Sequence, residues 1–368
     1  MYLRALSVVN YKNIREAMVE FSPKLNTFIG DNGAGKTNLL DALYSLSFTK
    51  SFFSASDQLN ITHGEDYFML QGKYKRDGDD ETIVYGYQNG QKKQLKRNGK
   101  LYRKMSDHIG LLPLVIVSPS DSVLILGGSE ERRKFTDGVI SQYNSGYLDN
   151  LLRYNRVLLQ RNNLLKQSVV NSRFDDEMVT VYDNELVQCG ERIYQQRKDF
   201  VRDLIPVFQY YYSFISGGND EVGLTYQSDL NHQPFDALLR QSLKNDRIVQ
   251  YTTVGIHKDD LLLDLDGFPL KKLGSQGQQK SYLVALKLAQ FEFIRKISGL
   301  KPVLLLDDIF DKLDKNRVEK IVTMVSGDQF GQIFITDTNR EHLDSILRLV
   351  SNDYRIFLVT KGKVEIIR

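Results

Sequence analysis

The feature that most constrains this chain is a glycine-rich octapeptide at residues 30–37, which reads Gly, four residues, then Gly-Lys-Thr. Glycines lack a Cβ, so the backbone of such a loop can turn its N–H groups onto phosphate oxygens. The lysine is expected to reach the β- and γ-phosphates of a nucleotide, and the helix that begins there directs its positive end at the same charge. The predicted nucleotide contacts are Gly30, Asp31, Asn32, Gly33, Ala34, Gly35, Lys36, Thr37 and Asn38.

The residues on either side of this loop supply the context that the motif needs. A short apolar run over residues 25–29 predicts a strand that enters the loop, and residues 36–44 have helical spacing after it. A Gly-rich turn with an incidental lysine requires neither, so we favour the nucleotide site. Thr37 is predicted to offer its hydroxyl to Mg²⁺.

A second element of a phosphate site lies at residues 303–308, where four aliphatic residues are followed by two acids. This is the form expected of a buried parallel strand whose carboxyl end faces a magnesium and phosphate site. Asp307 is predicted to hold Mg²⁺ together with Thr37. Asp308 is the predicted catalytic residue, because it is placed to orient and polarise an attacking water.

A third motif precedes a strongly helical run over residues 281–297. Its serine and glycines place a hydroxyl and bare N–H groups at a helix N-terminus, which makes a second anion site. One nucleotide does not need two such sites in one subunit, so the second site is predicted to serve the nucleotide of a partner subunit. The predicted contacts there are Gly274, Ser275, Gln276 and Gly277, and we call this motif the signature.

Strand-like segments predict an antiparallel pair at the N-terminus that leads to the loop strand, and an antiparallel β lobe inserted after the loop helix. They are rich in β-forming residues, with turns at residues 77–78 and 98–99. The later strands are rich in basic residues, and a solvated strand face explains such a run as well as a nucleic-acid contact does. The segments lie at residues 2–11, 18–21, 67–74, 81–87 and 92–97. The candidate DNA contacts are Lys73, Lys75, Arg76, Lys92, Lys93, Lys96, Arg97 and Lys100.

The periodicity becomes helical in the middle of the chain, so we expect three segments. Residues 1–140 form the first part of an α/β head, residues 141–245 an all-α arm, and residues 246–368 the second part of the head, with the signature and magnesium motifs. The arm is too short and too irregular in its heptads for an extended coiled coil.

Composition limits the class of protein. The 368 residues suffice for two domains, and 41% hydrophobic with 26% charged residues is ordinary for a globular protein. A net charge of +3 does not indicate a nucleic-acid ligand, so any basic surface must be local. The single cysteine, Cys189, fits a reducing cytoplasm and a buried apolar role. Neither a signal peptide nor a membrane-spanning run is apparent, so we expect a cytoplasmic protein without a membrane partner.

The three motifs, in this order, resemble those of the ABC-type ATPases. Their spelling is similar to that of the bacterial RecF recombination mediators, which are relatives of the SMC heads, and the resemblance covers essentially the whole chain. It implies an α/β ABC-type ATPase head with a P-loop sheet and an antiparallel β lobe, plus the inserted all-α arm. It also implies ATP and Mg²⁺ as cofactors.

The same resemblance implies a function. The chain is expected to form an ATP-dependent homodimer on gapped, single-stranded or junction DNA during recombinational repair, replication and SOS induction. Weak, DNA-stimulated ATP hydrolysis would act as a switch for release. RecR is the implied partner, with RecO in the same pathway.

The chain departs from the family pattern at several positions. Residues 255–260 have Ile and Lys where the family usually has Pro and Arg. Residues 336–338 lie where many ABC-type ATPases have a switch histidine, and residues 118–121 contain no glutamine for a glutamine loop. His257 fits either a polar role near the signature or a satisfied core position. Residues 311–314 occupy the position of the D-loop.

Three other classes of protein share parts of this pattern. A transporter ATPase subunit normally has a shorter stretch between loop and signature. A chromosome-organising SMC-like scaffold needs long heptad repeats, which are missing. An ATP-gated nuclease needs a further acidic metal cluster, for which no room remains after Asp337.

Overall fold

The computed structural model describes residues 1–170, 175–218, 220–309, 313–338 and 353–368. The chain divides into two compact units: the first contains residues 1–121, 211–219 and 275–368, and the second contains residues 122–210 and 220–274. These limits differ from the expected segments, because residues 122–140 and 246–274 pack with the long helices. Helix α5 also contributes its last residues to the first unit, where Tyr211, Tyr212 and Ile215 are buried.

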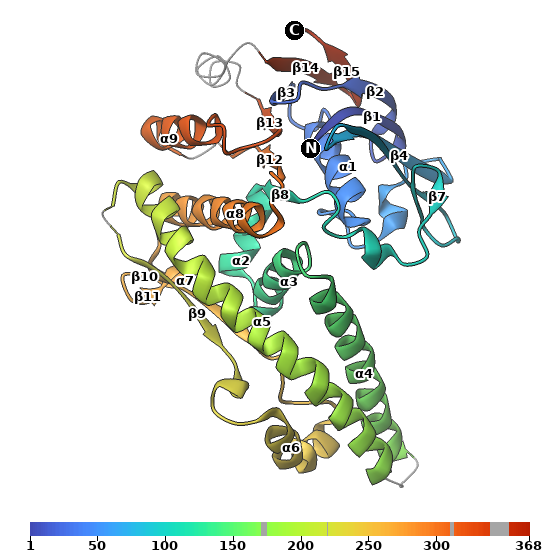
Figure 1. Ribbon diagram of the computed structural model, residues 1–368, viewed down its shortest axis with the longest axis vertical. Helices are drawn as coiled ribbons and strands as arrows, with labels where there is room; N and C mark the ends of the chain where they lie inside the picture. Colours follow the sequence, from blue (N-terminus) through green and yellow to red (C-terminus); the bar gives the residue numbers. More distant parts are fainter. Residues whose placement is uncertain (171–174, 219, 310–312, 339–352) are drawn as a thin grey trace. The chain divides into compact units, whose positions relative to one another are not determined.

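The first unit contains a six-stranded sheet with the strand order β15-β14-β3-β13-β12-β8 (Figure 1). Its first five strands in the chain are parallel and only β15 is antiparallel. Every residue of β12 and β13 is buried, as expected for parallel strands covered on both faces. The strands are β3 (Leu25–Ile29), β8 (Leu114–Val117), β12 (Val303–Asp307), β13 (Ile333–Asp337), β14 (Tyr354–Thr360) and β15 (Lys363–Ile366).

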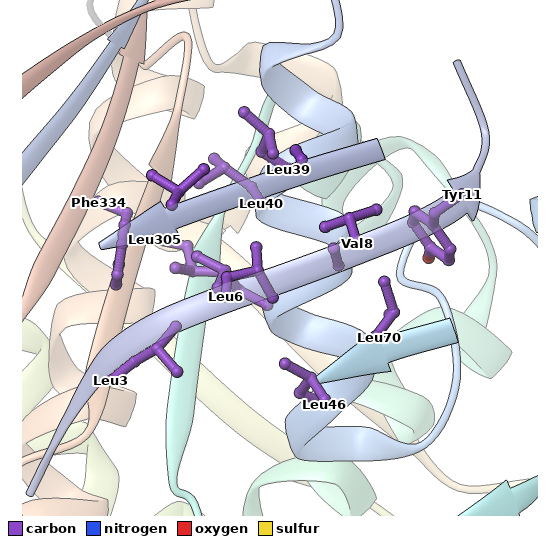
Figure 2. Packing of buried hydrophobic residues seen from close by; sticks show 14 of the residues in the cluster. Leu3, Leu6, Val8, Tyr11, Leu39, Leu40, Leu46, Leu70, Leu305 and Phe334 are labelled. Carbon is purple, nitrogen blue, oxygen red and sulfur yellow. The ribbon is translucent and has the colours of Figure 1, made fainter. Parts of the chain in front are cut away.

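The predicted N-terminal pair and the predicted β lobe join through β1 and β4 in a second six-stranded sheet, which we call sheet A, in the order β2-β1-β4-β5-β6-β7. Its inner face packs on helix α1 (Lys36–Phe48), and Figure 2 shows Leu6 and Val8 of β1 beside Leu39 and Leu40 of that helix. Its outer face carries the alternate residues of each strand. The strands are β1 (Tyr2–Tyr11), β2 (Ile14–Glu20), β4 (Tyr67–Arg76), β5 (Asp79–Gln88), β6 (Gln94–Arg97) and β7 (Lys100–Leu101).

Helix α8 has a long buried middle stretch in the first unit. It spans Gln276–Ser298 and is buried continuously from Ser281 to Ile294, so its apolar residues have no single face. It packs against β8. The unit also contains α9 (Lys315–Val325) and the short 3₁₀ helices η1 (Asp57–Asn60), η2 (Met105–His108) and η3 (Pro119–Ser122).

The second unit is not all-α, which corrects the expected arm. The strand β9 lies inside residues 141–245 and pairs with β10 in a three-stranded sheet of order β11-β10-β9. The glycine break after α5 lets the chain resume an alternating pattern there, with Val222 and Leu224 buried. The elements are α2 (Val123–Leu126), α3 (Ser129–Ile140), α4 (Ser145–Val170), α5 (Asp176–Ser216), β9 (Val222–Gln227), η4 (Asp229–Asn231), α6 (Phe235–Val249), β10 (Asp260–Leu265), β11 (Phe268–Pro269) and α7 (Leu270–Leu273).

His257 is a half-buried histidine with a hydrogen bond at each ring nitrogen. Its Nδ1 accepts a hydrogen bond from the Tyr154 hydroxyl at 2.9 Å, and its Nε2 donates to the carbonyl of Thr252 at 3.0 Å. Burial lowers the pKa of His257 to about 4. Cys189 is also buried, as expected.

Buried ion pairs hold the second unit together. Arg161 of α4 is completely buried and binds Asp183 at 2.6 Å and Asp246 at 2.8 Å. Arg197 of α5 does the same with Asp137 and Asp259. Charges at such depth are stable only while both partners are present. These pairs therefore fix which faces of the long helices meet α6 and the loop before β10.

Replacing Arg161 with methionine should destabilise the protein by roughly 3–5 kcal/mol, because it leaves the buried Asp246 carboxylate without its cation. Arg153→Met is the matched control, since Arg153 lies on the same helix and binds Glu185 of α5 at the surface. Urea unfolding of the two variants measures the difference. Equal midpoints would contradict the structural role of Arg161.

Candidate nucleotide-binding site

Residues 30–37 follow β3 directly and lead into α1, as the sequence predicts. Gly30 has φ +155°, and a Cβ on it would lie 2.2 Å from the carbonyl oxygen of Val359. Gly35 has φ +117°, and a Cβ there would lie 2.8 Å from Oδ1 of Asn13. Both the backbone angles and the close neighbours therefore require glycine at these two positions.

Lys36 directs its ammonium into the loop. Its Nζ donates to the carbonyl of Gly30 at 2.6 Å and to that of Asp31 at 3.0 Å. Burial lowers the pKa of Lys36, whereas the nearby carboxylates of Asp308 and Asp307 raise it. The charge is thus placed among backbone groups at the point where phosphates are expected.

Thr37 and Asp307 lie together, although they are far apart in the sequence. The Thr37 hydroxyl is 3.0 Å from Oδ1 and 3.2 Å from Oδ2 of Asp307. Burial raises the pKa of this carboxyl, and hydrogen bonds from Thr336 and Thr37 lower it. A hydroxyl and a carboxylate are hard oxygen ligands, which fit Mg²⁺ held by few protein groups and by phosphates. The described residues contain no cluster of three or more His, Cys, Asp or Glu side chains that could form a closed metal cage.

Asp308 has a left-handed backbone, with φ 47°. Such an angle is unusual for a residue other than glycine and marks a position fixed by its surroundings. Here the fixing contact is Thr336, whose hydroxyl accepts from the Asp308 N–H at 3.0 Å and donates to Asp307 Oδ1 at 2.8 Å. From the sequence, Thr336 is notable only as part of residues 336–338, where many ABC-type ATPases have a switch histidine.

Asn13 is a second residue that the sequence did not reveal. It lies in the turn between β1 and β2, and its Nδ2 donates to the carbonyl of Ala34 at 3.2 Å. Its Oδ1 accepts from Nδ2 of Asn38 at 2.8 Å. The asparagine thus supports the loop from outside, and only the fold brings that hairpin to the loop.

One pocket, of about 150 Å³, collects most of the predicted residues. Of the predicted nucleotide contacts in the loop, Gly30, Asp31 and Ala34 do not line it, and the residues at the signature do not line it either. Its walls are Asn32, Gly33, Gly35, Lys36, Thr37, Asn38, Asp307, Asp308 and Thr336.

The signature residues form the N-terminus of α8. Ser275 is exposed and caps the helix: its hydroxyl accepts from the N–H of Gln278, whose side chain accepts from the Ser275 N–H. Arg317 of α9 lies beside this helix start, because a Cβ on Gly277 would be 3.1 Å from Arg317 Nη1. The guanidinium is half-buried and already binds Asp314 at 3.1 Å and the Ser281 hydroxyl at 3.0 Å, so the exposed helix N-terminus is the group at this place that favours an anion.

The predicted D-loop position lies partly outside the described residues. Residues 311 and 312 of the D-loop position are outside the described residues, whereas Asp314 caps α9 by accepting from the Arg317 N–H at 2.9 Å. No helix in the described part of the chain combines the length and the apolar character that a membrane span requires.

Thr336→Val should lower ATP turnover roughly 10- to 100-fold while leaving ATP affinity nearly unchanged, because it removes a hydrogen bond to a carboxylate and the contact that holds Asp308. Thr336→Ser keeps the hydroxyl and is the matched control. Single-turnover hydrolysis and calorimetric binding separate the two effects. A valine variant as fast as the serine variant would show that Asp308 does not depend on Thr336.

Several known proteins are similar to this chain over nearly its whole length. The model of the RecF/RecN/SMC N-terminal domain matches residues 2–364. The DNA replication and repair protein RecF of Phocaeicola vulgatus is 51% identical over 366 residues, which are 99% of this chain and 98% of that protein. The protein of the same name from Bacteroides thetaiotaomicron is 52% identical over 366 residues, which are again 99% of this chain and 98% of that protein.

Solved structures give the same answer. The recombination mediator protein RecF with ATP, from the RecFOR pathway, is 29% identical, with a TM-score of 0.88 over 100% of this chain and 98% of that chain. The Smc head domain of Pyrococcus furiosus, at 16% identity and a TM-score of 0.58, shares the fold. These matches confirm the predicted ABC-type α/β head. The chain belongs to the RecF family of DNA replication and repair proteins, which share the SMC-like ATPase fold.

Proposed function

We propose that this chain is an ATP-dependent DNA-binding protein that dimerises on DNA and releases it after slow ATP hydrolysis. The observation that carries the proposal is the separation of two anion sites. The pocket around the loop is built without Gly274, Ser275, Gln276 or Gly277, while the helix start at Ser275 is exposed beside Arg317. A second copy of the chain would bring the missing half to each nucleotide.

The residues of the pocket have distinct roles in this proposal. Lys36 binds the β- and γ-phosphates, and Thr37 and Asp307 hold Mg²⁺, which would neutralise the charge that develops on the phosphates. Asp308, kept in place by Thr336, orients the attacking water and accepts its proton as general base. Among the described residues that line the pocket, Asp308 is the carboxylate without a proposed Mg²⁺ role and none is a histidine, which suits the slow turnover that a switch needs.

Relatives suggest the pathway. The names of the matched proteins connect them with DNA replication, repair and the RecFOR pathway. We infer that this chain acts in the cytoplasm on gapped, single-stranded or junction DNA during recombinational repair, and contributes to replication and SOS induction. RecR would be its direct partner, with RecO in the same pathway. Another SMC-like chromosome-organising head is the alternative, and a transporter ATPase subunit is a weaker one.

Ser275→Arg should abolish ATP-dependent dimerisation and leave ATP binding by the monomer within about threefold, because a bulky cation would occupy the place of the partner's γ-phosphate. Ser275→Thr retains a capping hydroxyl and is the matched control. Light scattering with and without ATP and gapped DNA measures the mass. An arginine variant that still doubles its mass with ATP would contradict the shared site.

The structure narrows the candidate DNA contacts on sheet A. Four of the eight already have acidic partners: Lys75 with Asp80, Arg76 with Asp77, Lys93 with Asp57, and Arg97 with the buried Glu81. The other four are exposed lysines. The strand register places Lys73 and Lys96 on the outer face, and Lys92 lies in the loop before β6. Lys100 lies opposite Arg97 in the register of β6 and β7, so its side chain is on the other face of the sheet from Lys73 and Lys96.

Replacing Lys73, Lys92 and Lys96 with alanine should flatten the slope of log affinity against log salt by roughly 0.9 for each lost phosphate contact. Binding to duplex DNA should be weak without ATP and tight with it. Lys100→Ala is the control and should leave the slope unchanged. The measurement is fluorescence anisotropy between 50 and 200 mM salt, the range over which about 10³–10⁵ in affinity is lost for 6–10 contacts. An unchanged slope in the triple variant would place the DNA elsewhere.

A further inference from the structure

The outer face of sheet A is hollowed by a groove across strands β4, β5 and β6. Its volume is about 230 Å³. Pockets for drug-sized ligands are larger, ~300–1,000 Å³. The groove therefore suits one planar ring system rather than a complete nucleoside triphosphate.

The groove exists because β5 has a glycine near its C-terminal end, where neighbouring strands flank it on both sides. The strand register places Gly86 between Met69 of β4 and Gln94 of β6, and Val84 and Gln88 lie on either side of it along β5. A Cβ on Gly86 would meet only the carbonyl oxygen of Phe68, at an ordinary contact distance of 3.5 Å. Its φ is not in the left-handed region. Neither packing nor backbone angle requires this glycine, although glycine weakens a strand, so its effect is to leave the surface open.

The walls of the groove match an unpaired nucleobase. Tyr67 is 46% exposed and Met69 is 37% exposed, which is unusual for large apolar side chains on an ordered strand but useful for stacking on a ring. Gln88, Gln91 and Gln94 carry amides that both donate and accept hydrogen bonds, as the edges of bases do.

The charge of the groove points to the same ligand. Lys92 and Lys96 line it, and no carboxylate is among the residues that the structure gives as its lining. A nucleobase reaches a protein with a phosphate on each side, so lysines at the rim are complementary to its backbone. An apolar side chain of a protein partner would gain nothing from them.

We propose that this groove binds a single unpaired base of a DNA gap, stacked on Tyr67 and Met69, with Lys92 and Lys96 on the flanking phosphates. The inference rests on the proposed function, because the base would reach the groove only when the protein lies on DNA. Bases of a continuous duplex are stacked inside the helix and cannot enter. The groove would therefore let sheet A distinguish a gap from intact duplex.

The test compares three DNAs of equal length with the full chain and Mg·ATP: a duplex, the same duplex with a short gap, and one whose gap nucleotides lack bases. The abasic gap keeps the phosphates and removes the rings. Wild-type protein should bind the gap with bases roughly 5- to 150-fold more tightly than the abasic gap, which is the effect expected of one stacked base.

Gly86→Leu fills the groove without requiring a backbone change and should abolish that difference while leaving duplex affinity unchanged. Tyr67→Ala should reduce it. Thr82→Leu is the matched control, because Thr82 lies on the same strand and face but outside the groove. It should behave as wild type.

Equal wild-type affinity for the two gaps would overturn the base groove, and so would equal behaviour of Gly86→Leu and Thr82→Leu. If the two gaps are equal and Gly86→Leu instead loses a protein partner, the groove accepts a protein side chain. Wild-type protein that binds none of the three DNAs would contradict the proposed function itself, whereas duplex binding without a base effect contradicts the groove alone.

Discussion

The candidate site depends on one chain of hydrogen bonds, from Thr37 through Asp307 to Thr336 and on to the N–H of Asp308. It joins the start of α1 to the ends of β12 and β13. The parallel register sets Asp307 opposite Thr336, so the bonds require no distortion of the sheet. Because the carboxylate is buried, losing any member would leave a polar group without its partner, which costs more than the bond itself contributes. The loop, the residues proposed to hold Mg²⁺ and the proposed catalytic Asp308 are thus held together.

The two faces of sheet A have different roles. Its inner residues pack on α1 and belong to the hydrophobic core of the first unit, whereas its outer residues face away from that core and can contact a ligand. The ion pairs of Arg97 and Lys93 explain why a run of basic residues is only partly available to DNA. The three outward lysines and the hollow at Gly86 share this face, so we infer that charge holds the backbone while the groove examines the bases.

The second unit contains two networks of buried charge in addition to its apolar core. Arg161 and Arg197 each bind two carboxylates inside the unit. Such pairs add little net stability compared with apolar residues of the same size, but a misplaced helix would leave them unpaired. They therefore act chiefly on specificity, fixing the register of α4 and α5 over their length.

The sequence by itself determined the loop, the two acids, the signature serine and the strand pattern of the β lobe, because each depends on residues adjacent in the chain and on local backbone chemistry. The prediction that residues 141–245 are all-α was wrong, because the alternation over Val222–Gln227 is too short to outweigh the long helical pattern around it. Only the tertiary structure decided which lysines are paired, that Asn13 supports the loop, and that Thr336 holds Asp308. These are contacts between strands and hairpins far apart in sequence, and the physical reason is that pairing register, which no local pattern specifies, sets which side chains meet.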